Sequence, residues 1–457
     1  MKSLASYVFF GALSVACLLV SCKPDMVADS LQKVPDPPVI SRRNPEETLT
    51  LFLTGNTLGT LKPCGCSTGQ LGGFDRRAAI FNRVPENKKL VIDTGKLLGG
   101  DSQQDSIKLS MIFEALTLLD YDAVNLSSID LTLARDIGLL EDNIFKVVTA
   151  SDAAIPSIFA RDVQVAGRKM RVNAVAIDAE SLDIDNLKNI FSDATEQLRL
   201  NILIAENLDC SDDSDILTAI EAMNIVDVIV CSPEADEPEV LSTGKNGLLV
   251  ITVGRFGKYL GELTVGISKG DSVNLSYTAI AVDETLPVTA ELVELYGNYQ
   301  QMLKDYNLLE ELPKIPLAEG LNYAGSDACQ LCHGYEYDKW SIKKHAHAYQ
   351  TLVEVGSQYD PECVECHVVG LKYESGFVNE SSDKGLRDVG CEICHGPGSR
   401  HIEAALSGND VVGLVSPKFG CNDCHTPEHS PGYGADKDGY FKKIIHWMEP
   451  EANKNVK

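Results

Sequence analysis

The chain has 457 residues, enough for two or three domains, and 44% of them are hydrophobic, which allows buried cores. A formal net charge of −26 at pH 7 argues against nucleic acid or an anionic membrane surface as a binding partner. The same charge electrostatically favours a protein partner with a basic face. All nine histidines lie after Cys332, so any imidazole chemistry is confined to the C-terminal part of the chain.

The N-terminal residues predict an export signal. A positive start precedes an apolar run over residues 8–20, which is shorter than a typical membrane-spanning helix. The Leu-Val-Ser-Cys ending at Cys22 resembles the lipobox of bacterial lipoproteins, which implies lipidation of Cys22 and removal of residues 1–21. An uncleaved anchor or plain secretion is the alternative. The proline-rich and charged segment 22–47 then predicts a tether. The expected location is the periplasmic face of the outer membrane or the cell surface.

Strands and helices alternate from residue 48 to about residue 285. Short apolar runs rich in β-branched residues predict strands, and longer segments show helical periodicity. An α/β two-sheet sandwich covered by helices fits this order best. The predicted strands are 49–54, 89–93, 121–126, 145–150, 201–205, 226–231 and 248–253, with a hairpin at 163–177, antiparallel strands over 259–282, and helices at 106–119 and 214–223.

Residues 48–285 also resemble the periplasmic 5'-nucleotidase branch of the calcineurin-like metallophosphoesterases, which implies an α/β/β/α sandwich. The segments that carry the resemblance are Thr54-Gly55-Asn56-Thr57-Leu58-Gly59, Asp93-Thr94-Gly95-Lys96, Tyr121-Asp122-Ala123-Val124 with Ser127-Ser128-Ile129-Asp130, and Gly257-Lys258-Tyr259-Leu260-Gly261. In the family, these segments hold two metal ions.

The metal ligands of that family are replaced in this chain. The residues that stand at the ligand positions are Asn56, Leu58, Lys96, Ser128, Ile129 and Gly254. A two-metal hydrolase needs oxygen and nitrogen ligands that hold both ions close together, and a domain without histidine cannot rebuild the family's site. We therefore expect the fold to be kept and the phosphoesterase activity to be lost. A residual phosphohydrolase with an all-oxygen metal site is the alternative.

Four further cysteines form a second candidate site, because Cys64, Cys66, Cys210 and Cys231 each follow or close a predicted strand. Parallel strands of α/β folds end at the edge where sites are built, so the four thiols are expected to converge. Three roles are predicted as alternatives for these thiols: structural disulfides, a redox-active catalytic thiol pair at Cys64 and Cys66, or a site for a soft metal ion. A structural bridge is expected to join Cys64 or Cys66 to Cys210 or Cys231, because the first two are too close together for an unstrained bridge.

The turn at Lys62–Cys66, followed by Leu71–Arg77, resembles that of degenerate nucleotidase-like proteins fused to cytochromes. This resemblance favours a redox role for Cys66. Residues 48–285 are called the front domain and residues 325–457 the C-terminal block. Residues 286–324 connect them and are predicted to contain an amphipathic helix at 290–306 followed by a linker.

The C-terminal block contains four copies of Cys-x-x-Cys-His, the attachment motif of c-type haem. The two thiols bind the haem vinyl groups and the adjacent histidine binds the iron, so four covalently bound haems are predicted. Zinc sites or disulfide pairs are the alternative, although neither needs a histidine after every second cysteine. The motifs are Cys329, Cys332 and His333; Cys363, Cys366 and His367; Cys391, Cys394 and His395; and Cys421, Cys424 and His425.

Residues 325–447 resemble the tetrahaem cytochromes that accept electrons from hydroxylamine oxidoreductase in nitrifying bacteria. The matching residues are Trp340 with His345-Ala346-His347-Ala348, Gly390–Gly398, and a late histidine. The resemblance implies three distal ligands: His345 for the His425 haem, His401 for the His333 haem and His446 for the His395 haem. The His367 haem would keep an open position, which His347 or His429 could fill. We expect His345 and His347 to lie on one helix with Trp340 and Tyr349.

Taken together, the sequence predicts an exported lipoprotein that carries electrons through four haems to or from redox proteins. Its front domain would serve for docking or for thiol redox chemistry. An oxidoreductase acting at the His367 haem or at Cys64 and Cys66 is the second reading. Four haems in so short a block leave little room for an ordinary apolar core, so haem loading and folding should be inseparable.

Overall fold

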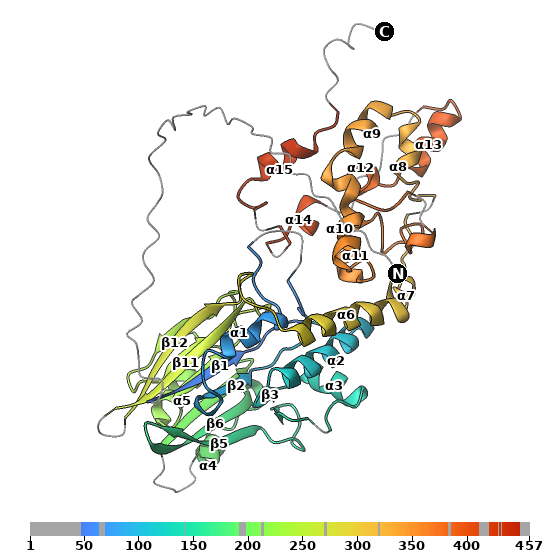
Figure 1. Ribbon diagram of the computed structural model, residues 1–457. Helices are drawn as coiled ribbons and strands as arrows, with labels where there is room; N and C mark the ends of the chain where they lie inside the picture. The colour runs from blue at the N-terminus through green and yellow to red at the C-terminus, as the bar shows by residue number, and fades with distance from the viewer. Residues whose placement is uncertain are drawn as a thin grey trace, which may run out of the picture. The chain divides into compact units, whose positions relative to one another are not determined.

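The front domain consists of two six-stranded sheets that pack face to face, with helices on their outer faces (Figure 1). The computed structural model describes residues 47–447 apart from 64–68, 142, 192–197, 212–213, 269–271, 319, 383–384, 411–419, 428 and 431. Within the chain, Asn44–Lys457 form one compact unit. The predicted two-sheet α/β sandwich is confirmed.

The first sheet has the strand order β12-β11-β1-β2-β3-β4. Strands β1 to β4 pair in parallel, whereas β11 pairs antiparallel to both β1 and β12. The strands are β1 (Thr48–Thr54), β2 (Lys89–Asp93), β3 (Ala123–Asn125), β4 (Lys146–Val148), β11 (Tyr259–Ile267) and β12 (Val273–Ala281).

The second sheet has the order β5-β6-β7-β8-β10-β9, with antiparallel strands only at its two edges. The inner strands β6, β7, β8 and β10 are parallel. The strands are β5 (Ile158–Val165), β6 (Arg168–Asp178), β7 (Leu198–Glu206), β8 (Val228–Cys231), β9 (Val240–Thr243) and β10 (Leu249–Thr252). The hairpin predicted to turn at Ala166-Gly167 is the β5–β6 pair.

The helices of the front domain lie on the outer faces of the two sheets. Helix α6, which the sequence places in the connecting segment 286–324, runs beside α2 (Figure 1) and covers the first sheet together with it, so α6 packs as part of the front domain. The helices are α1 (Arg77–Phe81), α2 (Gln103–Leu118), α3 (Ser128–Asp136), α4 (Ile184–Phe191), α5 (Asp215–Met223), α6 (Ala290–Asp305) and α7 (Leu308–Glu311), with 3-10 turns at Phe74–Arg76, Glu86–Lys88 and Ala179–Ser181.

Three buried apolar clusters separate these layers. Alternate residues of one strand enter different clusters, because successive side chains in a strand point to opposite faces of the sheet. In β1, Leu51 faces the other sheet while Phe52 faces α2 and α6. In β7, Ile202 faces the first sheet and Leu203 faces α4 and α5. The layer order is therefore helices, sheet, sheet, helices.

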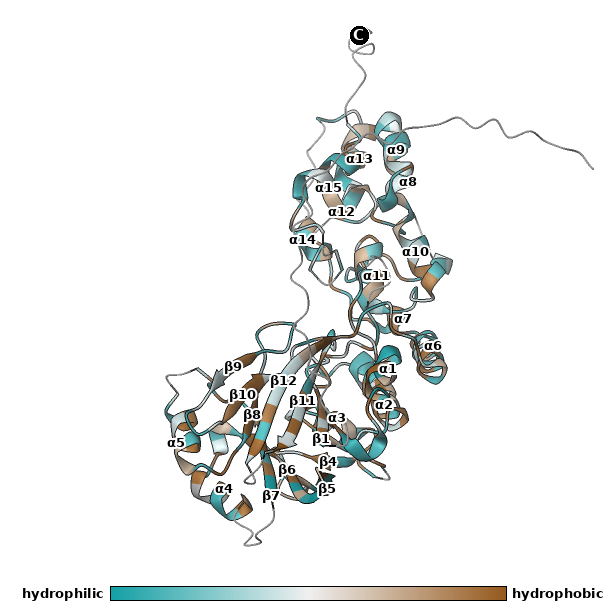
Figure 2. Ribbon diagram, turned by 60° about the vertical axis from the view of Figure 1, so that its left-hand side comes forward, coloured by the Kyte–Doolittle hydropathy of each residue, from teal (hydrophilic) through white to brown (hydrophobic). Residues whose placement is uncertain are grey.

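The C-terminal block is built from short helices that carry or flank the haem-attachment motifs. Figure 2 shows mainly teal and white on α8, α9 and α14, whereas the strands of the second sheet carry much more brown. The helices are α8 (Ser326–Gln330), α9 (Gly334–Ser341), α10 (Ala348–Val355), α11 (Pro361–His367), α12 (Cys391–His395), α13 (Ser399–Leu406), α14 (Cys421–Cys424) and α15 (Lys437–Ile444), with 3-10 turns at Lys344–His347 and Glu380–Ser382.

The prediction of one continuous helix is wrong for the segment that contains Trp340, His345, His347 and Tyr349. The chain instead forms α9, a 3-10 turn that holds both histidines, and α10. Lys343 before the turn is extended, which breaks the helical path. The break lets the Trp340 indole donate to the carbonyl oxygen of Val389 at 3.0 Å. Among the described residues, no helix is long and apolar enough to cross a membrane.

Candidate functional site

Each attachment motif lies on or beside one short helix. Two cysteines three residues apart in a helical turn project from the same side, as two bonds to one flat group require. Helix α11 is the best defined of these, with Asp360 as its N-cap and Pro361 in its first turn. In the described part of the chain, all eight motif cysteines are free of disulfide bonds. The thiols are therefore available for covalent attachment.

Three of the four motif histidines face a second imidazole ring. Two imidazoles that share one metal ion at about 2 Å have ring centroids roughly 6 Å apart. The observed separations match this spacing, and all three pairs are those that the cytochrome resemblance implied. The pairs are His333 with His401 at 6.2 Å, His345 with His425 at 6.2 Å and His395 with His446 at 6.1 Å.

The hydrogen bonds of two rings fix the tautomer that metal binding needs. His367 Nδ1 lies 2.5 Å from the carbonyl oxygen of Ala348, and His446 Nδ1 lies 2.9 Å from that of Ile444. A carbonyl only accepts, so Nδ1 carries the proton and Nε2 keeps its lone pair. Burial also lowers the pKa of His367, which favours the neutral, ligating form.

His367 differs from the other three motif histidines. Within the described ranges, no second histidine ring is stacked across from it at the spacing of the three pairs. His347 is exposed, and its neighbour Ala348 lies on the Nδ1 side of His367, behind the ring. Burial is the main cause of the lowered pKa of His367; the Ala348 carbonyl opposes it, and His429 adds to it through its charge. His429 is therefore nearby without being paired to His367.

The four motifs follow one another in space in the order first, third, fourth, second. The thiol of Cys329 in the first motif lies beside that of Cys391 in the third. Cys394 of the third is close enough to interact with Cys421 of the fourth. The fourth and second motifs then meet where the thiol of Cys424 lies beside that of Cys366. The motifs thus form a continuous row that ends at the second motif.

Residues outside the motifs make contacts that help to hold His345 and His425 in place, and the sequence analysis did not identify these residues. The Val389 backbone N–H donates to the His345 carbonyl oxygen at 2.9 Å, so the segment just before the third motif holds the 3-10 turn that carries His345. Ser430 Oγ lies 2.9 Å from His425 Nδ1. A serine five residues after a motif histidine gives too weak a signal to be found in advance.

In the front domain, polar side chains gather where the parallel strands of both sheets end. They line a small hollow of about 10 Å³ that includes Asn56, Thr94, Lys96, Glu206 and Ser232. Lys96 Nζ donates to Ser232 Oγ at 3.0 Å and so links the two sheets. Burial raises the pKa of Glu206, against the opposing effects of a hydrogen bond from Asn125 and the charge of Lys96. A lysine thus lies at the edge where the parallel strands of both sheets end.

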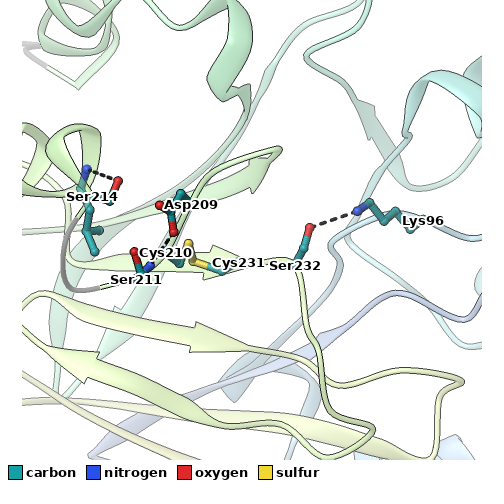
Figure 3. The surroundings of a disulfide bond; sticks show 8 residues. Lys96, Asp209, Cys210, Ser211, Ser214, Cys231 and Ser232 are labelled. Atoms are coloured by element: carbon teal, nitrogen blue, oxygen red, sulfur yellow. Dashed lines mark hydrogen bonds between the residues drawn. A yellow bond between two sulfur atoms is a disulfide. The ribbon is translucent and has the colours of Figure 1, made fainter.

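The predicted convergence of four cysteines requires a correction. Cys210 and Cys231 form a disulfide with each other, beside the Lys96–Ser232 contact (Figure 3). The expectation that Cys64 or Cys66 bridges to this pair is wrong. Cys231 ends β8 and Cys210 follows the neighbouring strand β7, so the parallel pairing brings these two together without another partner. Cys64, Cys66 and the lipidation candidate Cys22 lie outside the described residues.

Comparisons with known proteins separate the two halves of the chain. Residues 328–396 match the family model described as cytochrome c554 and c-prime. The curated cytochrome c-554 of Nitrosomonas europaea is 33% identical over 97 residues, which are 18% of this chain and 41% of that protein. The chain therefore spans less than half the length of this relative.

Solved structures that resemble the front domain have low sequence identity to it. They include a 5'-nucleotidase precursor from Thermus thermophilus (18% identity, 59% of this chain and 61% of that one, TM-score 0.44) and the calcineurin-like phosphoesterase YfkN from Bacillus subtilis (15%, 57% and 98%, 0.43). The sulfate thiohydrolase SoxB from Thermus thermophilus is a third (16%, 56% and 61%, 0.44). The chain thus joins a two-sheet α/β sandwich to a region, residues 328–396, that matches the family model of cytochrome c554 and c-prime.

Proposed function

We propose that the protein transfers electrons through four covalently bound c-type haems. The observation that carries this proposal is the set of three imidazole pairs, each at the spacing that two histidines binding one metal ion would have. When bound, each haem supplies a one-electron ferric/ferrous couple. The chain's own part is to hold two neutral imidazoles in fixed positions, so that neither ligand has to move when the charge of the iron changes.

The spatial order of the motifs supports transfer along a row. Contacts between thiols of neighbouring motifs join the first motif to the third and the second motif to the fourth. The third and fourth motifs are joined through Cys394 and Cys421. Attachment points this close together would hold neighbouring haems near enough for electrons to pass from one to the next along the row.

The proposed location and partners follow from the sequence. The lipobox-like ending at Cys22 supports a lipid anchor on an exported protein, and c-type haem attachment requires export in bacteria. The net charge of −26 favours a redox partner with a basic face, because opposite charge accelerates encounter. Metabolic labelling with a radioactive fatty acid, with Cys22→Ala as the control, tests the anchor. Label retained in the variant would rule it out.

The proposal assigns the front domain no phosphoesterase activity. The described residues contain no group of three or more His, Cys, Asp or Glu side chains placed to hold a metal ion. Lys96 and Ser232 hydrogen-bond across the edge where such ions would lie. Hydrolysis of a nucleoside monophosphate by the purified protein that depends on added divalent metal would contradict this assignment.

The haem proposal is tested by counting haems and their ligands. The pyridine haemochrome and the intact mass should both give four haems per chain. His345→Ala should convert one low-spin haem to high spin in the electron paramagnetic resonance spectrum, because its ring opposes His425. His347→Ala is the matched control, because His347 is exposed and two positions away. Fewer than four haems, or equal spectra for both variants, would refute the assignment.

A second function is favoured by the surroundings of His367. Since this ring lacks an opposed histidine at pair spacing among the described residues, its haem would have a position for a small ligand or substrate. The protein would then be an oxidoreductase fed by the other three haems. Carbon monoxide added to the reduced protein should bind to one haem in four. If no adduct forms, catalysis at this haem is excluded and the protein is a carrier only.

A further inference from the structure

The second attachment motif is connected to the front domain by a buried carboxylate. Asp360 is 5% exposed and caps α11, the helix that carries Cys363, Cys366 and His367. Its Oδ1 accepts the backbone N–H of Glu362 at 3.0 Å, which fixes the first turn of the helix. Movement of this carboxylate would therefore move the residues that bind the second haem.

Within the described residues, the other hydrogen bonds to the Asp360 carboxylate come from helices α2 and α6 of the front domain. Gln104 of α2 donates its amide to Asp360 Oδ1 at 2.8 Å. Tyr299 of α6 donates its hydroxyl to Oδ2 at 3.1 Å, and Gln300 donates to the same oxygen at 3.5 Å. Gln104 also reaches the Tyr299 hydroxyl at 2.8 Å, which closes a three-membered cluster of Gln104, Tyr299 and Asp360.

This cluster is buried and specific rather than a surface contact. Tyr299 is 1% exposed, and burial followed by the nearby Asp360 charge raises its pKa, so it remains a hydroxyl donor. Beside it, Lys108 Nζ lies 2.6 Å from Glu362 Oε1, and the lysine side chain is 5% exposed. A buried carboxylate costs free energy unless donors surround it, and here two front-domain helices supply those donors.

The cluster is also close to the second haem's attachment point. Tyr296 packs beside Tyr299, with ring centroids 5.9 Å apart, and its hydroxyl lies 3.3 Å from Ser357 Oγ. Burial is the main cause of the raised pKa of Tyr296, and the charge of Asp360 adds to it. The backbone N–H of Cys363 donates to the Asp360 carbonyl oxygen at 3.0 Å. An electrostatic change at Asp360 should therefore be felt at the second motif. The other three motifs have no such carboxylate linked to the front domain among the described residues.

We propose that Gln104 and Tyr299 are positioning residues for the haem bound by His367. By holding Asp360, they fix α11 against the front domain and set the redox potential of that haem alone. The inference rests on the proposed four-haem function and gives the front domain a defined part in it. The negative charge of Asp360 stabilises the ferric state, and the donors from α2 and α6 weaken that effect.

The test uses the full haem-loaded protein and a redox titration followed by visible spectroscopy. His367→Met, which keeps both thiols, identifies the titration step of the second haem. Gln104→Met removes two donors at nearly constant volume and should shift this step to lower potential. Asp360→Asn keeps the helix cap but removes the charge, and should shift the step to higher potential. Gln301→Met, on the exposed face of α6, is the matched control and should shift nothing.

Opposite shifts of one step out of four would support the proposal, because a loosened interface alone would not change sign between variants. Should Gln104→Met load poorly, Tyr299→Phe removes a single oxygen and should shift the same step down by less. Four unmoved steps, equal shifts of all four, or a lower unfolding temperature alone would overturn it. A pyridine haemochrome count other than four would instead refute the underlying function.

Discussion

The front domain buries three continuous apolar clusters, whereas the described part of the C-terminal block buries one. That one cluster has nine residues and surrounds the second motif, with Val364 and Val368 at 0% exposure. The first, third and fourth motifs have exposed or half-buried cysteines and no apolar cluster of their own in the described ranges. Apolar burial organises the sandwich, whereas among the described residues only the second motif of the block has a comparable apolar surrounding.

The largest expected effect follows directly from this contrast. We expect the chain made without haem attachment to fold in its front domain and to remain unfolded around the first, third and fourth motifs, since no comparable core replaces the missing porphyrins. Hydrogen exchange read by mass spectrometry should show protection in β1, β2 and β7 and fast exchange in α8, α12 and α14. Protection of these three helices in the haem-free chain would show that the block folds on its own.

Shortening a buried side chain in the sandwich should destabilise the front domain without affecting the C-terminal block. Phe52 is 0% exposed and packs against Phe81 with ring centroids 5.1 Å apart. Phe52→Ala should lower the free energy of unfolding of the front domain by about 3–5 kcal/mol. The haem spectrum should not change. Ile144→Ala, at a residue that is 65% exposed, should change the free energy of unfolding by no more than about 0.5 kcal/mol. Denaturation followed separately by tyrosine fluorescence and by haem absorbance measures both.

The disulfide tests whether a covalent link adds to the stability of the sandwich. Cys210 and Cys231 are 21 positions apart, so closing this loop should stabilise the fold by about 3 kcal/mol. Cys210→Ser with Cys231→Ala should lose that amount in urea denaturation. If the pair instead cycles with the haems, thiol trapping of the reduced protein would label both cysteines, and trapping after air oxidation would label neither.

The sequence predicted the sandwich well because its signals are local. Alternating apolar residues in β1 and β7, and the Ala166-Gly167 turn, specify strands and a hairpin without reference to distant residues. Helix α3 was missed, although Ser127 and Asp130 form a capping box, Ser-x-x-Asp, that is readable in the sequence. Strand β9 was missed because its four residues are mostly exposed and show no apolar run.

The site was predictable only where spacing encodes it. The four motifs are visible in the sequence, and the family resemblance supplied the three imidazole pairs that the structure brings together. The contacts of Asp360 with Gln104 and Tyr299 could not be found in this way, since they join residues about 60 and 250 positions apart through the packing of three helices. The bond between Cys210 and Cys231 was likewise mispredicted, because the register of two parallel strands decides it.

The smallest expected effect concerns a buried charge in the sandwich. Burial raises the pKa of Asp93 to about 6, against hydrogen bonds from Thr54 and Gly95 and the charge of Arg77, all of which lower it. The folded state therefore binds this proton more tightly than the unfolded chain does. Below about pH 4 the carboxyl is protonated in both states and costs no stability. As the pH rises from about 4 to about 6 the free energy of unfolding falls, and above about pH 6 the loss stays constant at up to about 3 kcal/mol.

Asp93→Asn should remove this dependence. The amide oxygen can still accept from the Thr54 hydroxyl, whose distance to Asp93 Oδ2 is 2.6 Å in the wild type. At pH 7 the variant should be more stable than the wild type by up to about 3 kcal/mol, and the difference should vanish near pH 4. The measurement is the free energy of unfolding in urea at intervals between pH 4 and pH 8. A difference that is independent of pH would mean that Asp93 stays ionised in the fold, with Arg77 offsetting the cost of burying its charge.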